Sequence, residues 1–127
     1  MDFLLDTHVL LWWDRQDSQL GNAAEAAIRD PKNSVFVSAA SIWEIAIKAR
    51  KGKLAFEGSP CELIEANGFT SLPIRPEHGE MAGALDWGHV DPFDRVLVAQ
   101  AKTENFVLVH ADSVIRGFGE VSQLWAR

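Results

Sequence analysis

The sequence predicts an α/β fold of three layers, with a mostly parallel central sheet and helices on both of its faces. Short, unbroken apolar runs are typical of strands buried on both sides, and the chain opens with one at Phe3–Leu5. Segments of helical periodicity separate these runs and supply the crossovers that parallel strands need. The chain has 127 residues, 47% of them hydrophobic, so we expect one domain over residues 1–127.

The first half of the chain alternates apolar runs with helical segments. Val9–Trp13 looks helical, and Ser18–Arg29 is alanine-rich with an apolar stripe at helical spacing. Asp30–Asn33 contains a proline and ends this second helix. Val35–Val37 is the second apolar run, and Ser41–Arg50 follows it as a strong helix that ends in a Lys-Gly-Lys sequence.

The second half continues this alternation. Ser59–Asn67 begins with Ser, Pro and Glu at the spacing of a helix start, and a glycine follows its end. Phe69–Ile74 predicts a third strand, which its proline restricts to a sheet edge or to a short length. The remaining expected elements are helices at Glu77–Leu85 and Asp94–Glu104 and strands at Phe106–Val109 and Val121–Trp125.

Composition narrows the function classes. No apolar run approaches the length of a membrane span, and no basic lead with a long apolar stretch opens the chain, so we expect a cytoplasmic protein without membrane segments. The single cysteine, Cys61, excludes a disulfide framework and a cysteine-based zinc site. The net charge of −6 argues against binding nucleic acid through a broad basic face. It is compatible with an enzyme that contacts a few phosphates and keeps acids for a metal.

Acidic residues recur where the predicted strands end and the next helices begin. They are Asp6, Glu44, Asp94 and Asp112. Because the carboxyl ends of parallel strands meet at one edge of a sheet, we expect these acids to lie together. Crowded carboxylates destabilise a fold unless a cation neutralises them, and Mg²⁺ or Mn²⁺ prefers such oxygen ligands.

Each acid also has a simpler interpretation as part of a helix start. Asp6 and Asp112 each precede a helical segment and can cap it. Glu44 stands three residues after Ser41, which is the spacing of a capping box. Asp94 suits a helix N-terminus through the helix dipole. One shared metal site explains the arrangement of all the acids better than independent caps do.

The sequence resembles the PIN-domain nucleases, and in particular the VapC-type toxins of bacterial toxin–antitoxin pairs. The stretches that carry the resemblance are Leu4–His8, Ser38–Lys48, His89–Arg95 and Leu108–Asp112, in the same order along the chain. The resemblance implies a PIN fold and Mg²⁺- or Mn²⁺-dependent endoribonuclease activity that hydrolyses RNA phosphodiester bonds. It also implies a homodimer and neutralisation by a small cognate antitoxin protein.

The resemblance assigns the metal-binding and catalytic role to Asp6, Glu44, Asp94 and Asp112, with the Thr7 hydroxyl beside them. The chain departs from the family pattern two residues before the last acid. At His110 such proteins commonly carry Thr or Ser. The histidine there either weakens a hydrogen bond to water at the metal or lies beside the site without effect.

Several further residues are candidates for contact with RNA. Thr7, His8 and His89 are close to the acids in sequence, whereas we expect His78 to be a structural hydrogen-bond donor. Asp91 precedes a proline, which is turn chemistry, and we expect it at most beside the metal ligands.

Two basic positions add to these candidates. Arg95 follows an acid and is a candidate for a phosphate contact or for a salt bridge within the site. Lys48 belongs to a basic cluster with Arg50, Lys51 and Lys53, which either contacts RNA phosphates or is a solvated helix end favoured by the dipole.

Two adjacent tryptophans are candidates for a contact between proteins. Trp12 and Trp13 cannot both face the core from one side of a helix, so we expect one to be exposed for a contact with a second copy or an antitoxin.

The main alternative function is a PIN-like binding module without turnover. An aspartyl phosphatase with Asp6 as nucleophile is a weaker alternative, because its usual second aspartate is replaced by His8.

Overall fold

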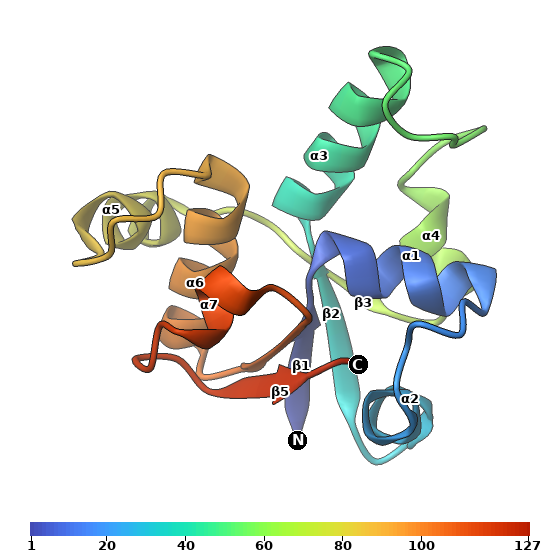
Figure 1. Ribbon diagram of the computed structural model, residues 1–127, viewed down its shortest axis with the longest axis horizontal. Coiled ribbons are helices and arrows are strands. Elements are labelled where there is room, and N and C mark those ends of the chain that lie inside the picture. Colours follow the sequence, from blue (N-terminus) through green and yellow to red (C-terminus); the bar gives the residue numbers. More distant parts are fainter.

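The computed structural model describes residues 1–127 and contains a five-stranded sheet in which every neighbouring pair of strands is parallel (Figure 1). The strand order is β3-β2-β1-β4-β5, so β1 is central and β3 is an edge strand that ends just before Pro73, as that proline predicted. The strands are β1 (Asp2–Leu5), β2 (Ser34–Ser38), β3 (Thr70–Leu72), β4 (Val107–His110) and β5 (Gln123–Trp125). The predicted α/β class is confirmed.

Helices flank both faces of this sheet. In Figure 1, α5, α6 and α7 lie on one side of the strands, and α1, α2 and α4 lie on the other. The helices are α1 (Thr7–Arg15), α2 (Asn22–Arg29), α3 (Ala39–Arg50), α4 (Glu62–Ala66), α5 (Pro76–Ala84), α6 (Pro92–Glu104) and α7 (Ser113–Arg116). None of these helices combines the length and the apolar character that crossing a membrane requires.

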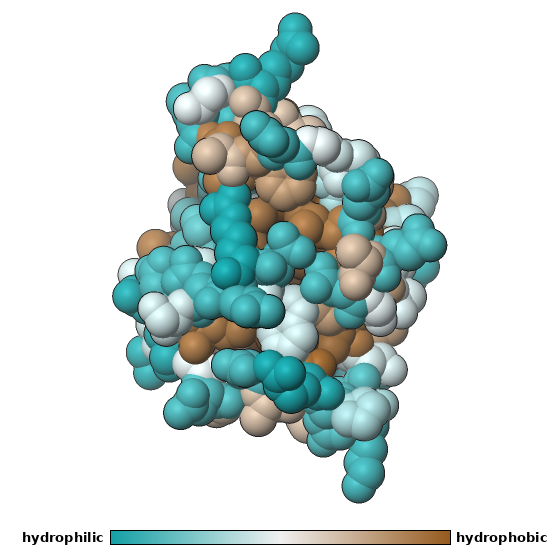
Figure 2. Space-filling model, turned by 90° about the vertical axis from the view of Figure 1, so that its right-hand side faces the viewer, coloured by the Kyte–Doolittle hydropathy of each residue, from teal (hydrophilic) through white to brown (hydrophobic).

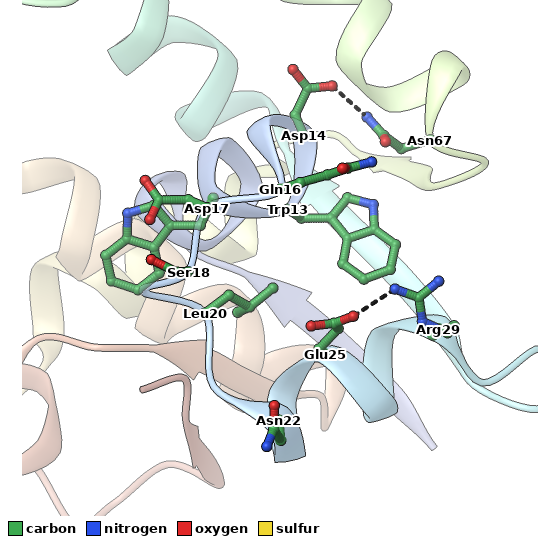
Figure 3. Close-up of a pocket in the computed structure, with 11 residues that line it drawn as sticks. Trp13, Asp14, Gln16, Asp17, Ser18, Leu20, Asn22, Glu25, Arg29 and Asn67 are labelled. Carbon is green, nitrogen blue, oxygen red and sulfur yellow. Dashed lines mark hydrogen bonds and ion pairs between the residues drawn. The ribbon is translucent and has the colours of Figure 1, made fainter.

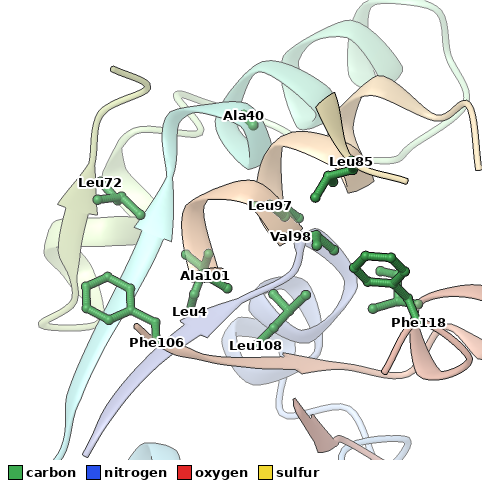
Figure 4. Close-up of a cluster of buried hydrophobic side chains, with 11 residues drawn as sticks. Leu4, Ala40, Leu72, Leu85, Leu97, Val98, Ala101, Phe106, Leu108 and Phe118 are labelled. Carbon is green, nitrogen blue, oxygen red and sulfur yellow. The ribbon is translucent and has the colours of Figure 1, made fainter. Parts of the chain in front are cut away.

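The apolar run of β1 supplies side chains to two separate cores. Leu4 packs with Leu97 of α6 and Leu108 of β4 on one face of the sheet (Figure 4). Phe3 and Leu5 point to the opposite face and pack among residues of α1 and α2. Because successive side chains of a strand alternate between faces, a strand covered on both sides must be apolar at every position. Each fully buried side chain of this kind stabilises the fold by about 2 kcal/mol.

Two helices begin later than their sequence patterns predicted. α2 begins at Asn22, because the chain at Gly21 packs against the C-terminus. The Gly21 N–H donates to the Ala126 carbonyl at 2.7 Å, and a Cβ at Gly21 would lie 2.7 Å from the carbonyl carbon of Arg127. α4 begins at Glu62, and its expected serine cap is absent, since the cap residue is Cys61 and no side chain caps the helix.

Of the helices that begin earlier than predicted, α3 and α6 bear on the site, and both begin at a side-chain cap. α3 begins at Ala39 because the Ser38 hydroxyl accepts a hydrogen bond from the N–H of Ala40 at 3.0 Å. α6 begins at Pro92, so Asp94 lies inside its first turn rather than at its start. These earlier starts matter for the site, because Glu44 and Asp94 then lie further inside their helices than the sequence patterns predicted.

Candidate active site

The predicted acids meet at the carboxyl edge of the sheet, where β1 lies beside β4. From β1 the chain runs to β2 and β3 on one side and returns to β4 and β5 on the other, which makes this edge a topological switch point. A cavity of about 90 Å³ lies here and has no hydrophobic residue in its lining. Its lining residues are Asp6, Thr7, His8, Glu44, Lys48, Asp91, Asp94 and Asp112.

Three aspartates of the cavity cap helices with one carboxylate oxygen and leave the other oxygen without a hydrogen bond from the protein. Asp6 Oδ1 accepts from the N–H of Val9 at 2.9 Å, at the start of α1. Asp112 Oδ1 accepts from the N–H of Val114 at 2.7 Å, at the start of α7. Asp91 Oδ1 caps α6 in the same way. Capping and metal binding are therefore not alternatives, because each side chain keeps an oxygen for the cavity.

Glu44 makes no capping box, contrary to one interpretation of the sequence. Because α3 starts at Ala39, Glu44 lies more than a turn inside the helix, and the Ser41 hydroxyl has no partner. Glu44 is 8% exposed and is held by two side chains. The Thr7 hydroxyl donates to its Oε1 at 2.7 Å, and Lys48 Nζ donates to its Oε2 at 2.5 Å.

Asp94 has a histidine partner that the sequence pattern did not reveal. His89 Nε2 lies 2.7 Å from Asp94 Oδ2, and the imidazole ring packs at 4.8 Å from the ring of Trp87. Potential ligand atoms of His89, Asp91 and Asp94 all lie within 4.8 Å of one another. The position of His89, close to the acid in sequence, suggested contact with RNA. Its geometry instead makes it a residue that orients Asp94.

Arg95 does not line the cavity and forms no salt bridge there, so that predicted role is wrong, whereas its contact with a phosphate stays a prediction. The guanidinium donates to backbone carbonyls of the segment that leads into α6, at distances of 2.6 to 3.0 Å. These carbonyls belong to Ala82, Leu85, Trp87 and His89. Since its donors are used in this way, Arg95 fixes the loop that carries His89.

Burial and repulsion between neighbouring carboxylates disfavour the charged form of the acids in this cavity. Burial raises the pKa of Asp6 to about 7, against a lowering by its hydrogen bond from Val9, and the charges of Asp94, Glu44 and Asp112 raise it further. Burial also raises the pKa of Asp94, although the hydrogen bond from His89 opposes this rise. The acids therefore interact through space, and an added cation would relieve this repulsion.

His110 does not face the cavity. Its ring is fully buried, its Nδ1 accepts from the N–H of Asp112 at 3.1 Å, and its Nε2 lies 2.7 Å from Gln123 Oε1. Because Nδ1 accepts, the ring proton resides on Nε2, and burial lowers the pKa of the imidazole. His110 thus fixes the backbone at Asp112 and has no direct contact with a metal site.

The other histidines differ in exposure. His8 is exposed at the rim of the cavity, where it is accessible to a substrate. His78 is fully buried away from it, accepts from the N–H of Arg75 at 2.9 Å and contacts Glu104 at 2.9 Å. The expected structural role of His78 is confirmed.

A larger groove of about 660 Å³ lies away from the acids, between α1 and α2 (Figure 3). Figure 2 shows this face, on which hydrophobic residues are surrounded by hydrophilic ones. Trp12 and Trp13 both line the groove and are both half-buried, so the expectation that one of them would be exposed is wrong. Arg29 covers the Trp13 ring at 5.3 Å, which helps to shield it. The exposed tryptophan is Trp43, at 58%.

The donor set of the cavity fits a hard divalent cation. Carboxylate oxygens line it, several of them without protein hydrogen bonds, and no cysteine is near. Mg²⁺ and Mn²⁺ favour such oxygen ligands together with water. The buried Asp6, with its raised pKa, is the kind of group that a bound cation would stabilise in its charged form.

Solved structures with the same fold cover nearly the whole chain. VapBC2 from Rickettsia felis, bound to a DNA fragment from its promoter, matches at a TM-score of 0.66 and 12% identity over 98% of each chain. A toxin–antitoxin complex from Klebsiella pneumoniae matches at a TM-score of 0.65 and 20% identity, over 96% of this chain and 95% of that one. VapBC-5 from Mycobacterium tuberculosis matches at a TM-score of 0.64 and 18% identity, over 99% and 98%.

No curated protein sequence matches the chain. The family comparison is decisive, because the PIN domain matches residues 3–121 and so includes every acid of the cavity. The chain belongs to the PIN-domain family.

Proposed function

We propose that this protein is a divalent-metal-dependent endoribonuclease, the cytoplasmic toxin of a type II toxin–antitoxin pair. The observation that carries the proposal is the convergence of Asp6, Glu44, Asp94 and Asp112 on one wholly polar cavity. Membership of the PIN-domain family and structural similarity to toxin–antitoxin complexes support it.

In this proposal the four acids hold Mg²⁺ or Mn²⁺. When bound, the ion supplies positive charge that polarises a phosphodiester and makes water a better nucleophile. Asp6 and Asp112 offer the oxygens that their helix caps leave over. Glu44 and Asp94 are oriented for the same cavity by Thr7 and by His89.

The other polar groups of the cavity position RNA. Lys48 lines the cavity and pairs with Glu44. Its ammonium group can instead donate a hydrogen bond to a phosphate oxygen of bound RNA. His8 is exposed at the rim, within reach of a bound strand. Hydrolysis forms a bond from water oxygen to phosphorus and breaks one phosphorus–oxygen ester bond, and the released oxygen takes a proton.

The proposal includes two protein partners. The first is a small cognate antitoxin, because the similar structures from Klebsiella pneumoniae and Mycobacterium tuberculosis are toxin–antitoxin systems. The second is another copy of this chain. One exposed aromatic side chain supports the homodimer, since Trp43 is 58% exposed and packs edge-on against the half-buried Phe93 at 5.1 Å.

Cleavage of labelled RNA by variants with isosteric amides tests the proposal. We expect Asp6→Asn and Glu44→Gln to abolish cleavage in Mg²⁺ while circular dichroism shows an unchanged fold, because an amide removes the negative charge and keeps the shape. EDTA should abolish cleavage by the parent protein. If either variant cleaves as fast as the parent in Mg²⁺, the proposed mechanism is wrong.

One observation favours a second candidate, a PIN-like binding module without turnover. Two acids of the cavity already have resident partners, since Lys48 pairs with Glu44 and His89 contacts Asp94. These partners partly neutralise the cavity without a metal. Calorimetric titration with Mg²⁺ or Mn²⁺, beside the RNA assay, separates the candidates, because binding of metal or RNA without any cleavage supports the module.

A further inference from the structure

The end of α3 is a strongly cationic segment on an acidic chain. Lys48, Arg50, Lys51 and Lys53 are four of the chain's 12 lysines and arginines and lie within six residues. The last three are exposed and form no ion pair or side-chain hydrogen bond. Exposed Arg29 and Arg75, by contrast, form ion pairs with glutamates. The segment therefore has uncompensated positive charge.

The backbone gathers three of these cations around one turn. Gly52 has a positive φ of 70°, and its N–H donates to the Ala49 carbonyl at 3.1 Å. The N–H of Lys53 donates back to the Lys48 carbonyl at 2.9 Å, so the chain reverses over the last helical turn. Lys51 follows Lys48 by three residues, which places both on the same side of α3.

This cationic turn is continuous with the acidic cavity. Lys48 lines the cavity and pairs with Glu44, whereas Lys51 is the C-cap of α3 and Lys53 follows it in the turn that folds back onto the Lys48 carbonyl. In Figure 1, α3 rises away from the sheet, and its end forms the top of the molecule. The top of the space-filling view in Figure 2 is likewise hydrophilic. An extended chain leaving the cavity along α3 would meet these lysines next.

We propose that Lys51 and Lys53 form a phosphate-binding extension of the active cavity, which holds the backbone of a single-stranded RNA on one side of the cleaved bond. The inference rests on the proposed nuclease function. A chain of net charge −6 with acids in its cavity repels a polyanion, so productive binding needs local positive charge next to the cavity. Single-stranded RNA fits because its phosphates are flexible enough to follow a helix side.

A purely structural role would be stabilisation of the negative end of the helix dipole. The two roles differ in the dependence of RNA binding on salt, because each phosphate contact adds about 0.7 to the slope of log affinity against log salt. The double variant Lys51→Gln/Lys53→Gln should therefore lose about 1.4 of this slope, and about 25-fold in affinity near 0.1 M salt.

The measurement is fluorescence anisotropy of a labelled oligouridylate over a range of salt, with Mg²⁺ present and with Asp6→Asn in every protein to prevent cleavage. Lys32→Glu is the matched control, because it changes the net charge by the same −2 at an exposed residue of the α2–β2 turn. Lys51→Arg/Lys53→Arg keeps both charges and should keep the slope. Circular dichroism shows whether α3 is intact.

The expected result is a lower slope and affinity for the glutamine double variant alone. Equal slopes and affinities for this variant and for Lys32→Glu would overturn the inference, because the loss would then be a general charge effect. Cleavage of RNA by the parent protein is measured in parallel. If the parent cleaves while the two variants bind alike, the nuclease proposal stands and only the phosphate-binding role fails; if the parent neither binds nor cleaves RNA, both fail.

Discussion

Removal of the buried charge of Asp6 should stabilise the metal-free protein. Asp6→Asn keeps an oxygen that can cap α1 through Val9 and removes the carboxylate that burial disfavours. The pKa of Asp6 is raised from 3.8 to about 7 in the folded protein. At about 1.4 kcal/mol per pKa unit, ionisation of Asp6 costs the folded state up to about 4 kcal/mol.

The sign of the pH dependence follows from proton binding. Between pH 3.8 and about 7 the folded protein holds the Asp6 proton while the unfolded chain has released it, so this contribution to stability falls as pH rises and is flat above pH 7. The advantage of Asp6→Asn over the parent should be near zero below pH 3.8 and largest above pH 7. For a chain of 127 residues, it corresponds to at most roughly 15 °C in Tm.

Thermal unfolding in EDTA, followed by circular dichroism across this pH range, measures the difference. Addition of Mg²⁺ should raise the Tm of the parent more than that of Asp6→Asn, because only the parent has the full set of acids. A parent protein that is more stable than Asp6→Asn above pH 7 in EDTA would refute the reasoning. The carboxylate would then be stabilised by contacts of the chain itself.

Other variants test the support of the site and of the fold. His89→Ala should weaken Mn²⁺ binding by about 10- to 100-fold in calorimetry, and His89→Gln should restore much of it because its amide can still donate to Asp94. Arg95→Lys should lower the free energy of unfolding in urea by about 2–4 kcal/mol, because one ammonium cannot replace the donors to four carbonyls. Gly21→Ala should destabilise by about 1–3 kcal/mol through collision with the C-terminal backbone, whereas Gly79→Ala, with open space at its Cβ inside α5, should stabilise by up to about 1 kcal/mol.

The layers of the fold were predictable because a strand that is buried on both faces is apolar at every position. Phe3–Leu5 is apolar at each position, and the structure uses alternate residues for two different cores. The convergence of Asp6 and Asp112 followed from the same logic, since carboxyl ends of parallel strands share an edge.

Sequence patterns could not predict contacts between residues that belong to different elements of the fold. Arg95 follows Asp94 and looked like a phosphate ligand, but its partners are carbonyls 6 to 13 residues earlier in the chain. The late start of α2 depends on the C-terminus, which passes Gly21 from the far end of the sequence. The choice between cap and metal ligand at Asp6 was also unanswerable from spacing, because it depends on which carboxylate oxygen each partner uses.

Calorimetric titration of Mn²⁺ into the parent protein and into Asp6→Asn, Glu44→Gln and Asp94→Asn tests the central claim most directly. If these acids share a divalent cation, the parent binds Mn²⁺ and each substitution weakens binding at least about tenfold. Absence of binding by the parent, or equal affinities across the series, would contradict a shared metal centre at the carboxyl edge of β1 and β4.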